Sequence, residues 1–434
     1  MIDTNLAIAI LLGSFFVMIL CKLPITFALA ASSTMTMLYL DIPLMSMVQQ
    51  MAKAINSFSL MAIPFFILAG EIMGAGGIST RMLNFANVFV GRFRGGLAQV
   101  NCLASMFFGH LSGSAVADVS SLGTILIPMM KKAGYDEDFS VGITVTSSCQ
   151  GVLIPPSHNM IIYSVAAGGV SVGRLFMGGL VPGVLMGIVL MIICGFIAIK
   201  RNYPKGEKLT PQQALKMSLD AIPALFTAII ILVGVSAGIF TATESAAIAC
   251  IYALIISFLY YRELKVKMIP GILMNCVKTL AMVFSLIAAA GAFGWILAYL
   301  QVPKMITGML LSVSSSKIVV FLLINLMLLI LGCIMDMAPL ILIVTPILVP
   351  VVQSFGMDPV QFGVVLIFNL AVGLCTPPVG SALFVGCGIG GISVEKTVKA
   401  MIPMYLGMLF MLMVVTFVPQ VSLWLPNLVM PAAV

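Results

Sequence analysis

The composition of the 434-residue chain excludes an ordinary soluble domain. Hydrophobic residues make up 61% of the sequence and charged residues 8%, with a formal net charge of +7, whereas soluble domains carry about 25% charged residues. The mean hydropathy is +1.20, and stretches such as Leu175–Ile199 contain no charge. We predict an all-α polytopic membrane protein, one integral membrane unit over residues 1–434, with roughly ten to twelve hydrophobic segments. The short alternating segments of a membrane β-barrel are missing.

The first apolar segment does not resemble a cleaved signal peptide. No basic residue precedes its long apolar run, and Lys22 follows it, which places the end of this span in the cytoplasm. The basic loops 200–208 and 260–267 are assigned to the cytoplasm by the same rule. Orientation therefore explains the positive charge, and no nucleic-acid binding is expected. The nine cysteines are scattered, which indicates packing rather than disulfides or metal ligands.

Enzyme motifs are missing or stand in the wrong context. The sequence contains no H-E-x-x-H and no G-x-x-x-x-G-K-[ST], so ATP hydrolysis by a P-loop is excluded. One G-x-S-x-G match, Gly169–Gly173, lies between predicted spans rather than between a strand and a helix, and is interpreted as a loop. If the chain transports a solute, the energy must therefore come from an ion gradient or from another subunit. An intramembrane enzyme is disfavoured because no nucleophile–base pair stands out.

Two halves of the chain share glycines and prolines at a constant separation of 222 residues. Gly151 matches Gly373, the pair Pro155–Pro156 matches Pro377–Pro378, and "GGVSV" from Gly168 matches "GGISV" from Gly390. Glycine and proline report backbone geometry, so the matches predict an internal repeat, as in many secondary transporters. The sequence leaves open whether the repeats are inverted or parallel.

Each half contains one segment that proline must break and one that is too polar for a simple span. The double prolines lie in "GVLIPPSHN" (151–159) and "GLCTPPVGS" (373–381) and predict broken helices. Residues 109–123 and 332–346 predict re-entrant hairpins. Free carbonyls at half-helix ends suit Na⁺, and free N–H groups suit a carboxylate. The hydroxyls of Ser112, Ser114, Ser147, Ser148 and Thr376 could complete the ion's shell. The alternative is that these small residues only allow close helix packing.

Four carboxylates lie in or beside apolar segments: Glu71, Asp118, Glu244 and Asp336. Carboxylates at membrane depth are costly and commonly functional, which makes Asp118 and Asp336 candidates for ion- or proton-linked roles. The alternative is a carboxylate that faces water or caps a helix, and it is preferred for Glu71.

His158 and Asn159 depart from the repeat, because their counterparts are Gly380 and Ser381. His158 is either a structural donor or a residue that faces the substrate, and its chemistry leaves proton coupling open. Asn159 can donate to and accept from substrate hydroxyl or amide groups.

The chain resembles the large membrane subunit of tripartite ATP-independent periplasmic (TRAP) transporters. The matching segments are spread over nearly the whole chain: Ser59–Met73, Arg94–Gly123, Gly151–Ser157, Gly238–Ala247 and Pro359–Val385. Ala242 departs from the family, which often has proline there. "SHNM" (157–160) also departs from the more apolar run of many members and is similar to members that move sialic acid.

The resemblance implies an elevator-type ion transporter of the bacterial inner membrane. A transport domain with both hairpins and both broken helices would slide against a scaffold. We expect residues 1–95 to be mainly scaffold with an interfacial helix, 96–199 the first-half transport domain, 200–317 mainly scaffold, and 318–434 the second-half transport domain. The implied partners are a small membrane subunit, a periplasmic binding protein and a carboxylate substrate. A sialic acid or related sugar acid is favoured, and a C4-dicarboxylate is possible. The alternative function is a stand-alone Na⁺- or H⁺-coupled dicarboxylate or citrate-type carrier.

The resemblance also implies at least two Na⁺ sites. The second-half site maps to Gly332, Gly373, Thr376 and Val379. The 222-residue separation gives a first-half site at Gly151, Ile154 and Ser157, beside Ser112 and Ser114. Ile154 and Val379 would contribute backbone carbonyls. Substrate contacts are expected from Ser114, Pro155, Ser157, His158, Asn159 and Ser381.

Overall fold

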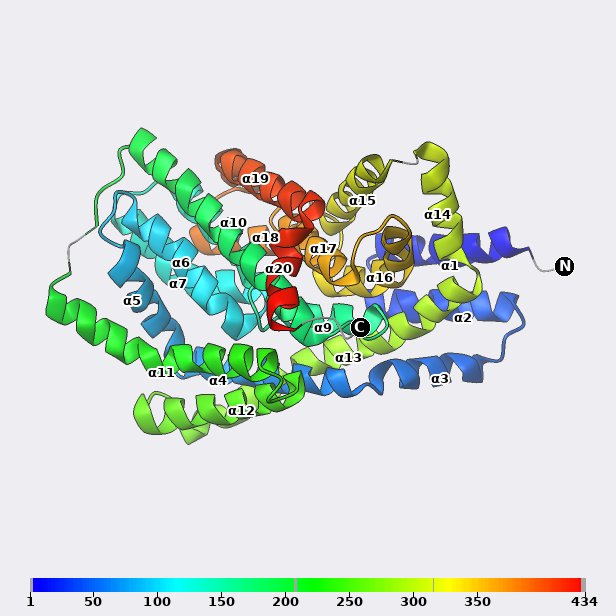
Figure 1. The fold of residues 1–434 in the computed structure, drawn as a ribbon, viewed down its shortest axis with the longest axis horizontal. Coiled ribbons are helices and arrows are strands. Elements are labelled where there is room, and N and C mark those ends of the chain that lie inside the picture. The colour runs from blue at the N-terminus through cyan, green and yellow to red at the C-terminus, as the bar shows by residue number, and fades with distance from the viewer. Residues whose placement is uncertain (1–2, 207–208, 315, 431–434) are drawn as a thin grey trace.

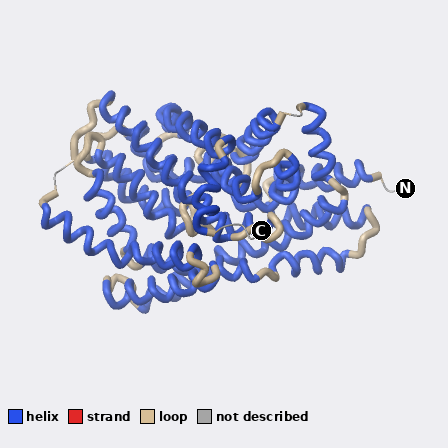
Figure 2. Tube along the Cα trace, viewed as in Figure 1, coloured by secondary structure: helices blue, strands red, loops and turns tan. Residues whose placement is uncertain are grey.

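The computed structural model describes residues 3–206, 209–314 and 316–430, without the side chains of residues 110–112, 310, 311 and 313. Helices form nearly all of this part of the chain, and no strand occurs in it (Figures 1 and 2). A single isolated bridge pairs Arg94 with Lys205. The prediction of an all-α protein is confirmed.

The described residues of the first half form ten α-helices and one 3₁₀ helix. They are α1 (Thr4–Leu20), α2 (Ile25–Tyr39), α3 (Leu44–Ile55), η1 (Phe58–Met61), α4 (Ala62–Ala75), α5 (Ile78–Val90), α6 (Gly96–Ser112), α7 (Ala115–Lys132), α8 (Glu137–Gly151), α9 (His158–Ala166) and α10 (Val172–Lys200).

In the second half, the part that the structure describes contains ten further α-helices and two short helices. They are α11 (Pro211–Ser236), α12 (Ala242–Ile255), the π-helix η2 (Ile256–Tyr260), the 3₁₀ helix η3 (Val266–Met268), α13 (Ile269–Tyr299), α14 (Val302–Val313), α15 (Lys317–Gly332), α16 (Met337–Ser354), α17 (Pro359–Leu374), α18 (Ser381–Gly390), α19 (Val394–Phe417) and α20 (Pro419–Val429).

Within the described residues, seven helices are long and apolar enough to cross a membrane. Six further apolar helices have only 10–17 residues, where about 20 are needed for a full span. These seven long and six shorter apolar helices compare with the roughly ten to twelve hydrophobic segments that the sequence predicts. Helix α17 is one of the shorter helices because it ends just before a proline pair.

Corresponding helices of the two halves begin 222 residues apart. This holds for α7 and α16, for α8 and α17, and for α10 and α19, while the starts of α9 and α18 differ from it by one residue. The separation first seen in glycines and prolines therefore extends to the helix boundaries.

Helices α8 and α17 lie at the centre of the fold and are buried along nearly their whole lengths. The arms α6 and α7 pack against α8, and α15 and α16 pack against α17. The two central helices also contact each other: Cys149 Sγ donates to the Ala371 carbonyl at 3.0 Å, and Cys375 Sγ donates to the Val145 carbonyl at 3.2 Å. The two broken helices therefore meet in one core.

A second group of helices packs around α4 and α13. Helix α13 contacts α2, α3 and α4, while α12 packs on α4 and α11 packs on α5. The turn between α11 and α12 is fixed by a reciprocal cap, in which Glu244 accepts from Thr241 N at 2.8 Å and Thr241 Oγ1 accepts from Glu244 N at 3.2 Å. Glu244 therefore caps a helix. Of its two interpretations, this contact supports the structural one rather than a functional carboxylate.

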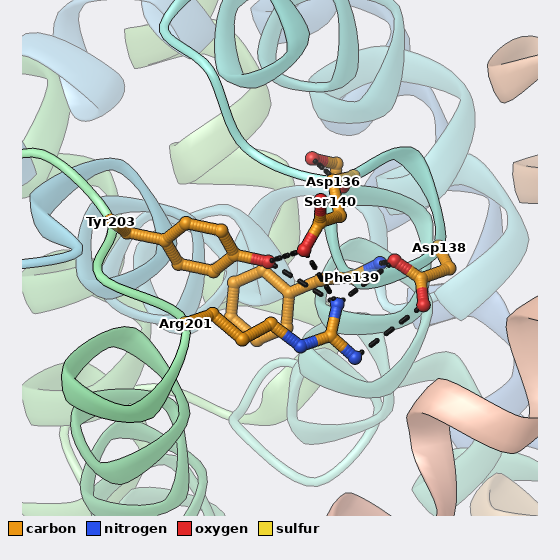
Figure 3. A network of polar contacts seen from close by, with 6 residues as sticks. All are labelled: Asp136, Asp138, Phe139, Ser140, Arg201 and Tyr203. Carbon is orange, nitrogen blue, oxygen red and sulfur yellow. Dashed lines mark hydrogen bonds and ion pairs between the residues drawn. The ribbon is translucent and has the colours of Figure 1, made fainter.

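A polar cluster ties the start of α8 to the end of α10 (Figure 3). Arg201 Nη1 lies 2.8 Å from Asp136 Oδ2 and 3.1 Å from Asp138 Oδ1. The Tyr203 hydroxyl donates to Asp136 Oδ2 at 2.7 Å. This hydroxyl, and then the Arg201 guanidinium, hold the pKa of Asp136 below its usual value. The cluster fixes the end of α8 that lies opposite the break.

Candidate functional site

The first broken helix stops at Gly151 and resumes at His158. The segment between them, Val152–Ser157, is buried throughout, and the Pro155–Pro156 peptide is cis. In a continuous helix, the carbonyls of Gly151 and Val152 would accept from the residues four positions later. Those residues are Pro155 and Pro156, which have no N–H. The double proline therefore deprives two adjacent carbonyls of their helical donors.

The tip of the first hairpin meets this break. Helix α6 ends at Ser112, whose side chain lies outside the described ones, and Ser114 caps α7 by accepting from Ala117 N at 3.4 Å. Between them, Gly113 has φ +57°, and its carbonyl accepts from Asn159 Nδ2 at 3.3 Å. A Cβ on Gly113 would lie 3.0 Å from His158 Nδ1. The structure thus brings Ser114, His158 and Asn159 together.

The second half repeats this arrangement with different atoms. Helix α15 ends at Gly332, and α16 begins after Asp336, which is exposed. Helix α17 ends at Leu374, and the peptide between the following prolines is again cis. Val379 N donates to the Cys333 carbonyl of the hairpin tip at 3.0 Å. In both halves a carbonyl at the hairpin tip accepts a hydrogen bond from the break.

Glycine pairs let each hairpin arm touch the broken helix backbone to backbone. A Cβ on Gly151 would lie 2.8 Å from Gly109 Cα, and a Cβ on Gly373 would lie 2.8 Å from Gly332 Cα. Any larger residue at Gly151 or Gly373 would push the hairpin away. The predicted ion-site glycines therefore have a packing role of their own.

The Ser157 hydroxyl, a predicted ion ligand, is buried without a hydrogen-bond partner among the described residues. The Asp118 carboxylate is also buried, next to the Ser105 hydroxyl. Ser157 is fully buried and Asp118 is 1% exposed, and a Cβ on Gly151 would lie 3.8 Å from Asp118 Oδ2. Burying unpaired oxygens is costly, and hard oxygen ligands suit a small cation. The first break therefore offers oxygen atoms that a cation could satisfy.

Thr376 at the second break uses its hydroxyl as a donor. Its Oγ1 donates to the Val372 carbonyl at 2.7 Å, and its backbone N donates to the Gly373 carbonyl at 3.0 Å. A hydroxyl that donates keeps its capacity to accept or to coordinate a cation. Thr376 can therefore both close the helix end and offer an oxygen ligand.

The hydroxyls of Ser147 and Ser148 both donate hydrogen bonds to neighbouring groups of the helices. Ser147 Oγ donates to Asn101 Oδ1 at 3.2 Å, and Ser148 Oγ donates to the Val145 carbonyl at 2.7 Å. Asn101 in turn donates to Thr144 Oγ1 at 2.6 Å, which links α6 to α8. Ser147 therefore takes part in packing between α6 and α8, whereas Ser148 bonds within its own helix, and an ion-binding role of either stays a prediction.

A cavity of about 620 Å³ separates the first hairpin from helices α4 and α13. Ser114 and His158 line one side, and Glu71, Asn275 and Thr279 line the other. Asn275 Nδ2 donates to Glu71 Oε2 at 3.4 Å. Among the predicted substrate residues, Pro155, Ser157, Asn159 and Ser381 are not part of its described lining.

The polar side of this cavity, lined by Glu71, Asn275 and Thr279, was not predicted from the sequence. Glu71 stands out as an acidic residue in an apolar segment, but Asn275 and Thr279 were not considered. Their spacing of four residues places them on one face of α13, and two polar residues on one face of an apolar helix are the signal that could have identified them.

Comparisons with known sequences agree on one family. Residues 12–421 match the family described as "Tripartite ATP-independent periplasmic transporter, DctM component". The "Uncharacterized protein YgiK" of Salmonella typhimurium is 43% identical over 98% of both chains. The sialic acid TRAP transporter large permease protein SiaM of Vibrio cholerae is 40% identical over 88% of this chain and 89% of its own. The 2,3-diketo-L-gulonate TRAP transporter large permease protein YiaN of Escherichia coli is 37% identical over 96% and 98%.

The fold also resembles a solved transporter. The YdaH transporter of Alcanivorax borkumensis superposes with a TM-score of 0.63 over 84% of this chain and 86% of its own, at 13% identity. At this identity the likeness concerns the fold alone. The sequence matches are far closer and cover nearly the whole chain. The chain therefore belongs to the DctM family, the large membrane subunits of tripartite ATP-independent periplasmic transporters.

Proposed function

We propose that this chain is the permease subunit of a Na⁺-coupled importer for a carboxylate substrate. Family membership supports the role of large permease subunit, with a small membrane subunit and a periplasmic binding protein as partners. The ion, the substrate and the movement are our proposals, and they rest in turn on the two breaks, on the cavity beside the first hairpin and on the packing of the two halves.

One observation carries the ion coupling: each hairpin tip is hydrogen-bonded to the break of its own half, where prolines remove the regular helical donors of two adjacent carbonyls. The bonds are Asn159 Nδ2 to the Gly113 carbonyl and Val379 N to the Cys333 carbonyl. Carbonyls at half-helix ends carry partial negative charge, and discontinuous helices of this kind coordinate Na⁺ in secondary transporters.

We assign one Na⁺ to each break, as the repeat suggests. The first site takes Gly151, Ile154 and Ser157, with Ser112 and Ser114 from the hairpin tip. The second takes Gly332, Gly373, Thr376 and Val379. The buried, unpaired Ser157 hydroxyl supports the first assignment. Asp118, which is also buried, is an ion- or proton-linked group beside the first site, and Asp336 holds this place at the second hairpin tip.

The substrate is assigned to the cavity beside the first hairpin. Its described lining contains no lysine or arginine, so a carboxylate would be met by the free N–H groups that begin α7 and α9. Ser114, His158, Glu71 and Asn275 can exchange hydrogen bonds with hydroxyl groups. Two relatives are named for sialic acid and 2,3-diketo-L-gulonate. Other relatives are named for C4-dicarboxylates. We favour a sialic acid or related sugar acid because the polar side chains of the cavity suit hydroxyl groups, with Pro155, Ser157, Asn159 and Ser381 near its path.

The repeats support an elevator movement. Both broken helices and their hairpins pack into one core, and the cavity separates the first hairpin from α4 and α13. We assign residues 96–199 and 318–434 to the moving domain, and residues 1–95 and 200–317 mainly to the scaffold.

Uptake into proteoliposomes tests the proposal. The chain is reconstituted with its small subunit, and substrate-loaded binding protein is added outside. Uptake of labelled sialic acid should follow an inward Na⁺ gradient and should stop when K⁺ replaces Na⁺. Uptake that is indifferent to this replacement would refute Na⁺ coupling. Uptake that proceeds without either partner would favour the stand-alone carrier.

A further inference from the structure

Tyr405 lies on α19, outside the residues assigned to either ion site, and its hydroxyl reaches the second break. The hydroxyl donates to the Cys375 carbonyl at 2.5 Å. Cys375 follows the last residue of α17 and directly precedes Thr376, and the Thr376 side chain lies beside the same hydroxyl. A side chain of α19 therefore caps the end of the broken helix α17 at the proposed Na⁺ site.

The carbonyl that Tyr405 binds would otherwise lose its donor. In a continuous helix, the Cys375 carbonyl would accept from Val379 N. At the break, Val379 N donates instead to Cys333 of the hairpin tip. The Tyr405 hydroxyl takes the place of that donor. The Cys375 carbonyl is then occupied by a hydrogen bond and does not act as an ion ligand.

The same hydrogen bond fixes the neighbouring groups. The Cys375 carbonyl and the Thr376 N–H belong to one planar peptide and point in opposite directions. Tyr405 holds the oxygen of this peptide, and the Gly373 carbonyl accepts from its N–H at 3.0 Å. With both ends of the peptide held, the directions of the Gly373 carbonyl and the Thr376 side chain are set. Both residues belong to the proposed second site.

In the first half, the position that corresponds to Tyr405 carries no hydroxyl. The counterpart of Tyr405 at the 222-residue separation is Gly183 on α10, and that of Thr376 is Ile154. A Cβ on Gly183 would lie 2.7 Å from Ile154 Cγ1. The corresponding positions thus face the break in both halves, but only the second half provides a hydroxyl. The two breaks are therefore chemically unequal.

We propose that Tyr405 is a positioning residue for the second-half Na⁺ site, which it acts on through the Cys375–Thr376 peptide. The inference rests on the proposed Na⁺ coupling. Removing the hydroxyl should free the Cys375 carbonyl and loosen Thr376, which weakens Na⁺ binding at this site and leaves the first site intact.

The test compares Tyr405→Phe with Tyr163→Phe. Tyr163 donates to the Pro359 carbonyl at 2.6 Å, at the opposite end of the same helix α17. Each variant therefore removes one hydroxyl donor to a backbone carbonyl of this helix. The purified complex with the small subunit is titrated with Na⁺ alone, in a choline background, and thermal stabilisation is recorded. The Na⁺ dependence of uptake is measured in parallel.

Tyr405→Phe should raise the half-saturating Na⁺ concentration by about three- to tenfold, as expected for one lost neutral hydrogen bond, with uptake restored at saturating Na⁺. Tyr163→Phe should leave that concentration unchanged. Combined with Thr376→Ala, Tyr405→Phe should add little, since both act on one site. An unchanged Na⁺ dependence in Tyr405→Phe, or an equal shift in both tyrosine variants, would overturn the inference. If Na⁺ changes neither the thermal stability nor the uptake of the wild-type complex, the proposed coupling itself is overturned.

Discussion

At the scale of single residues, the two breaks use different groups for similar tasks. Asn159 supplies a side-chain amide to the first hairpin tip, where Val379 supplies a backbone N–H to the second. Ser157 is buried without a described partner, whereas the Thr376 hydroxyl is already engaged as a donor. A hydroxyl that donates to a carbonyl keeps its lone pairs for a cation. Thr376 is therefore the residue at which the ion assignment can be tested most directly.

Replacing Thr376 by valine should weaken Na⁺ dependence, while serine should preserve it. Valine keeps the branched shape but removes the oxygen, and interactions of a hydroxyl with a charged group contribute about 1.5–3 kcal/mol. We expect the half-saturating Na⁺ concentration for uptake to rise roughly tenfold or more in Thr376→Val, and to stay near wild type in Thr376→Ser. Equal Na⁺ dependence in the two variants would remove Thr376 from the site.

At the scale of elements, glycines set how closely each hairpin lies on its broken helix. Gly109 meets Gly151, and Gly332 meets Gly373, with backbone atoms in contact. Small residues allow such approaches between membrane helices. The hairpin tip can reach the break only because its arm packs this closely, so packing and ion binding depend on the same positions.

Gly151→Ala should destabilise the protein, while Gly13→Ala serves as the matched control. Both glycines lie in helices, but no atom is within 4 Å of a Cβ on Gly13. Overpacking of a close contact costs about 1–3 kcal/mol, whereas an open helical site gains about 0.5–1 kcal/mol from alanine. Thermal unfolding of the purified protein should show a lower midpoint only for Gly151→Ala. Identical midpoints for the two variants would contradict the close-contact argument.

At the scale of the whole molecule, family membership makes the chain a multi-pass transport subunit of the bacterial inner membrane. The cavity beside the first hairpin has walls from both proposed domains: Ser121 of α7 on one side and Thr279 of α13 on the other. If the domains slide past each other during transport, this pair must separate or shift in every cycle.

Cross-linking across the cavity should therefore stop transport. Cysteines are placed at Ser121 and Thr279 in a background whose native cysteines are replaced and which retains uptake, and are joined by a short bifunctional thiol reagent. Cysteines at Lys131 and Glu137, which form a 2.6 Å ion pair within one proposed domain, provide the control. Uptake should be lost for the first pair and kept for the second. Undiminished uptake with the first pair fully cross-linked would exclude the elevator movement.

Much of the architecture follows from local sequence. Low charge and long apolar runs determine a membrane protein, and this was confirmed. Double prolines stop α8 and α17 where expected, because a missing N–H acts on its own helix whatever packs around it. The TRAP resemblance was also confirmed. Which hydrophobic segments form helices of full spanning length was not predicted, because composition does not show where an apolar run is divided between two short helices.

The sequence by itself determined the membrane class, the family, the two breaks and the residues around them. Only the tertiary structure decided which groups meet: Asn159 with Gly113, Glu71 with Asn275, and Tyr405 with Cys375. These partners lie between 30 and 204 positions apart in the chain. Local patterns act through neighbouring backbone groups, whereas contacts at such separations depend on how whole helices pack, and no motif records that.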